Sequence, residues 1–158
     1  MICGMDMGNQ LIETWQINDR LNRYLLAETG ADRLGVALAK GKSVADQFAH
    51  IHNVRLMWIK ASAPELMEGM EKIEKGDGTF DLLNQRLEIS GEAIASLLLK
   101  SIEAGGKVKN FKPHATAFVA YLVAHEANHR GQIEVALRQA GVPLSDKAGY
   151  GLWEWGVR

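Results

Sequence analysis

The feature that most constrains this chain is a pair of histidines on the apolar face of a helix. His125 and His129 lie four residues apart in a segment with helical periodicity, so their side chains stack one turn apart. At roughly 100° per residue, the same face carries Phe118, Leu122, Ile133 and Ala136. Burying two imidazoles costs free energy unless each ring nitrogen has a partner. The pair therefore predicts a helix that holds a divalent metal ion inside a core; the alternative is two core histidines bonded to backbone or water.

Three other segments show helical spacing, and no segment alternates as a strand would. The four predicted helices span residues 10–28, 43–61, 80–103 and 113–140. We predict one all-α domain over residues 1–158, an up-down four-helix bundle, the arrangement in which metal sites are built from facing helices. Residues 1–9 are predicted to be a loose lead-in. The aromatic, glycine-rich stretch 148–156 is predicted to be a short tail that packs on the bundle or on a partner.

Composition excludes several classes of function. The chain has 47% hydrophobic and 23% charged residues and a net charge of −1, with no apolar run of bilayer length. This balance argues against binding to nucleic acid or to an anionic membrane. The single Cys3 excludes an internal disulfide and a multi-cysteine zinc site. With no signal-like N-terminus, the predicted location is cytoplasmic.

Residues 125–129 also satisfy the HExxH pattern of zinc metalloproteases, with Glu126 in the place of the general base. The longer protease motif needs glycine three and histidine six residues after the second histidine, where this chain has Gln132 and Val135. A protease also needs a strand or groove for an extended peptide, and the sequence predicts no strand. The protease is therefore the weaker interpretation.

Two motifs together resemble the DinB/YfiT-like family of bacterial metal-binding four-helix proteins. One is Ser43-Val-Ala-Asp-Gln-Phe-Ala-His50-Ile, which opens the second predicted helix with a capping serine. The other is His125-Glu-Ala-Asn-His129-Arg-Gly-Gln-Ile on the fourth helix, and the tail Tyr150-Gly-Leu-Trp-Glu-Trp-Gly156 is similar to that of some members. The resemblance covers most of the chain in helix order and spacing.

The resemblance implies a three-histidine site made by His50, His125 and His129. Three imidazoles leave coordination positions open, as in catalytic metal sites, and similar sites hold nickel or zinc. Helical periodicity does not decide between His50 and His52, because each falls about 100° from the centre of the apolar face. His50 is preferred because it matches the family's Ala-His position. His114 is predicted to be an ordinary helix-start residue.

The resemblance further implies a transferase or isomerase that uses a low-molecular-weight thiol with the metal as Lewis acid. A small electrophile would be the second substrate, and relatives often form homodimers through their helices. The alternative from another class is a non-catalytic metal-binding or stress-response protein. The two differ in whether the metal keeps an open position or is closed by a fourth protein ligand.

Neighbours of the histidine pair supply supporting hypotheses. Tyr121, one turn before His125, either donates to a metal-bound water or is a core tyrosine. Arg130 either pairs with Glu126 or Glu134 as a brace behind the metal ligands or lies on a solvated face.

Three further residues carry packing predictions. Gly131 costs the helix about 1 kcal/mol relative to alanine, which a close approach of another helix would explain. Met57 and Trp58 are predicted to be core residues.

Overall fold

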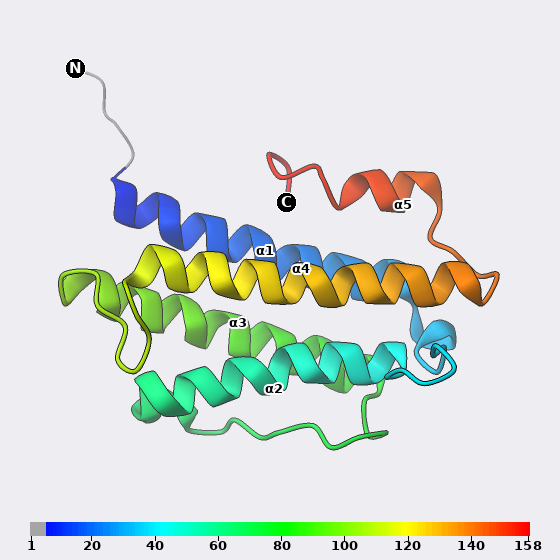
Figure 1. Cartoon of the computed structure of the whole chain (residues 1–158), viewed down its shortest axis with the longest axis horizontal. Helices are drawn as coiled ribbons and strands as arrows, with labels where there is room; N and C mark the ends of the chain where they lie inside the picture. Colours follow the sequence, from blue (N-terminus) through cyan, green and yellow to red (C-terminus); the bar gives the residue numbers. More distant parts are fainter. Residues whose placement is uncertain (1–5) are drawn as a thin grey trace.

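Four long helices and one short helix make up the protein, which is described by a computed structural model over residues 6–158 (Figure 1). Their bounds are α1 Met7–Thr29, α2 Val44–Ser62, α3 Phe80–Glu103, α4 Ala115–Gln139 and α5 Asp146–Gly151, with 3-10 turns at Ala31–Arg33 and Pro64–Met67. The described residues form no strand beyond two isolated bridges. The predicted all-α four-helix bundle is confirmed.

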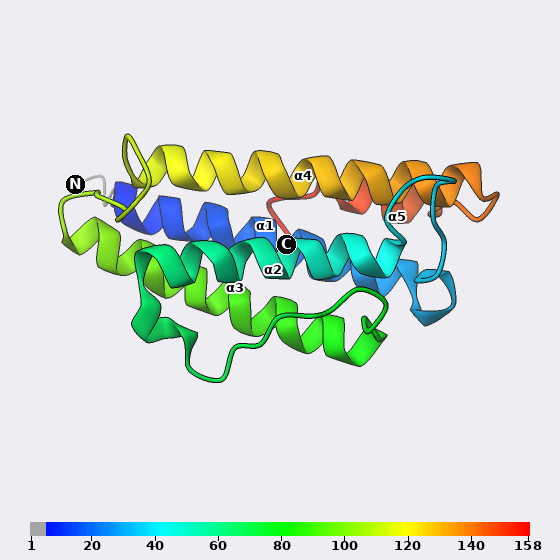
Figure 2. The same cartoon turned by 60° about the horizontal axis from the view of Figure 1, so that its bottom comes forward.

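The helices pack so that α3 and α4 each contact both α1 and α2. Figures 1 and 2 show that α1 and α4 run in one direction and that α2 and α3 run in the other. The structure therefore adds the order of directions to the predicted bundle: up, down, down, up. Two consecutive helices can run the same way because the long connection 63–79 carries the chain back along the length of α2.

Side-chain hydrogen bonds fix this connection to α2. Asn53 Nδ2 donates to the Ile73 carbonyl at 2.8 Å, and the Ile73 amide donates to Asn53 Oδ1 at 3.0 Å. The Gly76 amide donates to Asp46 Oδ1 at 3.0 Å, nearer the start of α2. The connection and the first half of α2 therefore form one wall of the molecule.

The N-terminal start of the bundle differs from the prediction. Helix α1 begins at Met7, so the predicted loose lead-in is wrong for residues 7–9, and residues 1–5 lie outside the described part. Glycine at position 8 allows the start of α1 to lie close to the end of α3. A Cβ added to Gly8 would lie 3.1 Å from Ile102 Cγ2.

Two apolar clusters and a polar layer form the interior. One cluster includes Leu25, Phe48, Leu83 and Leu137, and the other includes Trp15, Ile59, Ile94 and Phe118. On each long helix, buried polar residues fall between the members of the two clusters: Asn18, Asp19 and Asn22 on α1, Arg55 on α2, Ser90 on α3, and Glu126 and Arg130 on α4. The bundle thus has a buried polar layer across its middle.

Candidate metal centre

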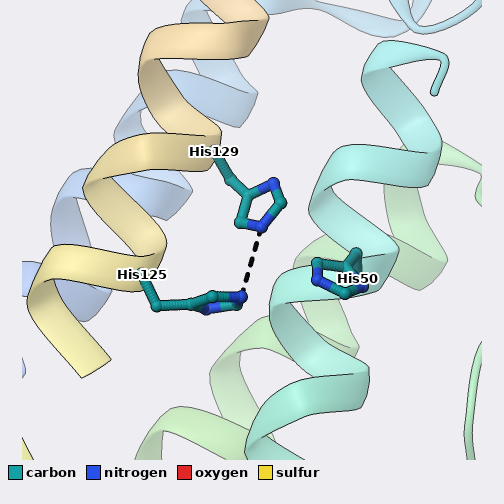
Figure 3. A group of neighbouring side chains, drawn as sticks. All are labelled: His50, His125 and His129. Atoms are coloured by element: carbon teal, nitrogen blue, oxygen red, sulfur yellow. Dashed lines mark hydrogen bonds between the residues drawn. The ribbon is translucent and has the colours of Figure 1, made fainter. Parts of the chain in front are cut away.

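Three histidines from two helices meet on one side of this polar layer. His50 projects from α2, and His125 and His129 project from successive turns of α4 toward it (Figure 3). The potential ligand nitrogens of all three lie within 4.8 Å of one another. The structure therefore brings together the three residues named by the family resemblance.

The two α4 histidines have a spacing suited to a shared ion. Their Nε2 atoms are 3.2 Å apart. Two metal–nitrogen bonds of about 2.0–2.1 Å, at an angle between octahedral and tetrahedral, place the nitrogens roughly 2.9–3.4 Å apart. The donor set is three imidazoles, which suits zinc and nickel. The residues present thus fit the metal that the sequence predicts.

His129 is oriented by a glutamine pair that sequence reasoning did not assign. His129 Nδ1 donates to Gln47 Oε1 at 2.5 Å, and Gln47 Nε2 donates to Gln132 Oε1 at 2.9 Å. Donation from Nδ1 fixes the tautomer in which Nε2 keeps its lone pair for a ligand. Gln47 precedes His50 by three residues and Gln132 follows His129 by three, so helical spacing alone could have indicated them.

The His125 ring is held mainly by its neighbours on α4. It lies nearly parallel to the Tyr121 ring, with centroids 6.5 Å apart and an interplanar angle of 15°. Its Nδ1 is buried and has no hydrogen-bond partner among the described residues. Tyr121 is 39% exposed, so the alternative of a core tyrosine is wrong. Its proposed hydrogen bond to a metal-bound water stays a prediction.

The surroundings of all three imidazoles lower their pKa and so favour the neutral form. Burial lowers the pKa of His129 to about 4, helped by the nearby His125, His50 and Lys42. Burial also lowers the pKa of His50, with Lys42 and His125 adding to the effect. The pKa of His125 is lowered by burial against the opposing charge of Glu126. Metal ions bind neutral imidazole, so few or no protons have to leave the three rings before the cluster binds a metal ion at neutral pH.

The other histidines lie elsewhere. His52 is fully buried on the opposite side of α2, where its Nε2 contacts the Glu71 carbonyl at 2.9 Å. Two residues advance a helix by about 200°, which is why only one of His50 and His52 can face α4. His114 is the N-cap of α4, and its Nδ1 accepts a hydrogen bond from the Ala117 amide at 3.2 Å.

Glu126 and Arg130 point away from the histidines into the polar layer. Glu126 accepts from Arg55 Nε and Nη2 at 2.7 and 2.9 Å, and from Asn18 Nδ2 and Asn22 Nδ2 at 2.7 and 2.6 Å. Arg130 Nη1 donates to the Oδ1 atoms of the same two asparagines at 2.9 and 2.8 Å. Arg130 is buried, so the solvated-face alternative is wrong, and it reaches Glu126 only through the asparagines.

Arg55 is the centre of this layer and was not singled out from the sequence. Its Nη1 lies 2.7 Å from Asp19 Oδ1, and its guanidinium carbon lies 4.8 Å from the Trp15 ring centroid. Burial lowers the pKa of Arg55, but the charges of Glu126 and Asp19 outweigh burial and raise it. Gly91 leaves room for this arrangement, because a Cβ there would lie 2.4 Å from Asp19 Oδ1.

These contacts argue against the metalloprotease. A general base has to reach a metal-bound water, whereas both oxygens of Glu126 are engaged by Arg55 and the asparagines. The part of the chain that the structure describes also lacks a strand to pair with a peptide.

Two packing predictions near the site are wrong. No atom of another segment comes within 4 Å of a Cβ added at Gly131, so no helix approaches closely there. Met57 is 52% exposed, so it lies at the surface rather than in the core. Trp58 is half-buried among the rings of Phe111, Phe118 and Tyr121.

The sequence model described as the DinB family matches residues 5–148. Neither the curated proteins nor the solved structures contain a significant match. Within residues 6–158, every helix is too short or too polar to cross a bilayer.

Proposed function

The chain belongs to the DinB family, and we propose that His50, His125 and His129 bind one divalent metal ion, zinc or nickel. The observation that carries this proposal is the convergence of three imidazoles from α2 and α4, with His129 fixed by Gln47 in the ligating tautomer. Neutral, pre-oriented imidazoles lower the cost of metal binding.

The surroundings of the cluster favour an accessible metal over a purely structural one. The metal-binding group found among the described residues consists of the three histidines, without a fourth histidine, cysteine or carboxylate. A cavity of about 580 Å³ borders His50, a size within the range of small-molecule sites. Three ligands, one of which lines a cavity, support a catalytic site.

We propose further that the protein is a transferase or isomerase acting on a small thiol and an electrophile, in line with the family resemblance. When bound, the metal supplies Lewis acidity that lowers the pKa of a thiol. Residues 6–158 contain no cysteine, so the described chain offers no thiol nucleophile of its own. Gln47 holds the proton on His129 Nδ1, and burial lowers the pKa of His129 and so favours its neutral form.

Metal analysis of protein purified without an affinity tag tests the site. We expect close to one zinc or nickel ion per chain in the wild type and loss of metal in His50→Ala, His125→Ala and His129→Ala. His52→Ala is the matched control, because it removes a buried histidine from the same helix outside the cluster. Full occupancy in His50→Ala with loss in His52→Ala would overturn the assignment.

A thiol-transfer assay separates an enzyme from a metal-binding protein. Metal-loaded protein is mixed with a small thiol and 1-chloro-2,4-dinitrobenzene, and thioether formation is followed by absorbance. The expected result is a rate above the free-metal control that disappears in His129→Ala. Equal rates with both proteins, at full metal occupancy of the wild type, would favour the non-catalytic alternative.

We also propose that the protein forms a homodimer. Tyr150 and Trp153 of the C-terminal segment are 74% and 80% exposed, which leaves apolar rings at the surface of one chain. Size-exclusion chromatography with light scattering at micromolar concentration should give twice the chain mass, and a monomer would end this proposal.

A further inference from the structure

The cavity beside His50 has walls from four parts of the chain. They are the segment before α2 (Lys40–Lys42), the first half of α2, Gln132 of α4, and residues 72–75 of the long connection, which runs along α2 in Figure 2. Asn53 and Asp46 anchor this connection through hydrogen bonds, so the cavity wall is held in place. The cavity is therefore built into the fold beside the cluster.

Its lining is rich in positive charge although the whole chain has a net charge of −1. Four lysines and two acids line it: Lys40, Lys42, Lys72, Lys75, Asp46 and Glu74. Lys72 Nζ pairs with Glu74 Oε2 at 3.2 Å, and Asp46 Oδ1 accepts from the Gly76 amide. The remaining lysines, Lys40, Lys42 and Lys75, form no ion pair with residues 6–158. A hollow whose lining carries an excess of one sign of charge concentrates ligands of the opposite sign.

Lys42 connects this charge to the histidines. It lines the cavity together with His50, and it directly precedes Ser43, the N-cap of the helix that carries His50. A molecule held near Lys42 is therefore close to the histidine cluster. Among the unpaired lysines of the cavity, Lys42 is the nearest in sequence to His50.

We infer that this cavity binds the anionic end of the thiol co-substrate, a carboxylate-bearing small molecule, and that Lys42 determines its specificity. The inference rests on the proposed function and names the substrate class for it. The ammonium of Lys42 attracts the carboxylate and places the other end of the molecule beside His50. A neutral thiol of similar size lacks this attraction and binds less tightly.

Equilibrium binding to cobalt-loaded protein tests the inference without relying on turnover. All proteins carry Cys3→Ser, which removes the single thiol of the chain. At saturating cobalt, 3-mercaptopropionate and 2-mercaptoethanol are titrated and the thiolate–cobalt absorbance band is recorded. Because a carboxylate can also chelate cobalt, the measured quantity is how a lysine substitution changes the ratio of the two dissociation constants.

Lys42→Ala should lower the preference for 3-mercaptopropionate roughly five-fold, the effect of one partly exposed ion pair. Lys42→Glu should lower it further, and Lys42→Arg should retain it. Added salt should shrink the wild-type preference. Lys60→Ala, an exposed lysine near the other end of α2, is the matched control and should leave the ratio unchanged.

Cobalt affinity provides the independent readout. Removing a positive charge near a bound dication should leave cobalt affinity in Lys42→Ala equal to or above that of the wild type. An unchanged thiol ratio in Lys42→Ala and Lys42→Glu, with cobalt bound, would overturn the inference and leave the metal site standing. Failure of the Cys3→Ser protein itself to bind cobalt would overturn the proposed function instead.

Discussion

The histidine cluster lies beside the polar layer, and both use side chains of α2 and α4, yet they differ in how their polar groups are satisfied. Glu126 follows His125 directly, but its carboxylate is enclosed by Arg55, Asn18 and Asn22. The histidines face the opposite way, toward one another between α2 and α4, and His125 Nδ1 has no partner among the described residues. In the polar layer the chain supplies both the positive and the negative groups. In the histidine cluster it supplies only the ligands for a positive ion.

This difference separates the structural role from the binding role. In the polar layer two arginines are balanced by Asp19 and Glu126, so the layer is complete without any bound group. The layer also sets the rotation of α4 about its own axis. When Glu126 points inward to Arg55, His125 and His129 point toward α2. The closed region therefore positions the open one, and the following predictions test whether they can be separated.

The largest expected effect is on stability, from Arg55→Ala. Removing the guanidinium leaves two buried carboxylates without their cation, which lowers the free energy of unfolding by about 3–5 kcal/mol. Urea unfolding followed by circular dichroism measures the change in metal-free protein. If this variant does not fold, Arg55→Lys, which keeps the charge but loses the two-pronged contact with Glu126, should show a smaller loss.

Arg23→Ala is the control for this prediction. Arg23 also pairs with a glutamate on another helix, Glu88 at 3.2 Å, but both side chains are partly exposed. Its loss should cost less than about 1 kcal/mol. Equal effects of the two substitutions would mean that the polar layer is not the closed, mutually dependent network described above.

The second prediction concerns the orientation of His129 by Gln47. Gln47→Ala removes the acceptor of the His129 Nδ1 proton, so zinc affinity should fall by roughly 10- to 100-fold while unfolding of the metal-free protein changes less. Competition with a chromophoric chelator measures the affinity. Gln47→Glu, which restores an acceptor, should recover most of the loss. A Gln47→Ala protein with wild-type affinity would show that the glutamine does not position the ligand.

The third prediction is a pH dependence specific to the histidine cluster. The pKa of His129 is about 4 in the folded chain against an ordinary value of 6.5. Between these values the unfolded chain binds a proton that the folded chain does not, so metal-free protein loses stability as the pH falls from 6.5 toward 4. Above 6.5 this contribution is fully present.

Solvent reaches the partly exposed cluster and screens this interaction, so the expected loss of stability is on the order of 1 kcal/mol. Unfolding at pH 7 and pH 5 measures it, with His129→Asn as the comparison. The variant should lose less stability than the wild type over this interval. Identical losses would mean that the ring is not kept neutral by its surroundings.

Local patterns predicted the helices well because each long helix has its own apolar stripe and its own end signals. The bounds of α3 coincide with the predicted residues 80–103, where a glycine pair follows the helix. The His125 and His129 pair was also visible, since four-residue spacing is a property of one helix. Family resemblance preferred His50 over His52, which helical periodicity alone left open.

The polar layer could not be predicted in the same way because its partners come from different helices. Arg55 contacts residues of α1, α3 and α4 that are up to 71 positions away in sequence. A single sequence does not indicate that the side chains of Asn18 and Asn22 lie between those of Glu126 and Arg130. Such buried polar contacts become visible only once the helix order and rotation are known.

The last prediction, a substitution of Gly131, has the smallest expected effect on stability. The sequence predicted a close helix neighbour at this position, but the described chain leaves it open, without a positive φ that would favour glycine. Gly131→Ala should therefore stabilise α4 by about 0.5–1 kcal/mol through helix propensity alone. Zinc affinity should not change, because the added methyl touches neither the histidines nor the polar layer. A loss of stability that grows with protein concentration would instead show that a second copy packs closely against this side of α4.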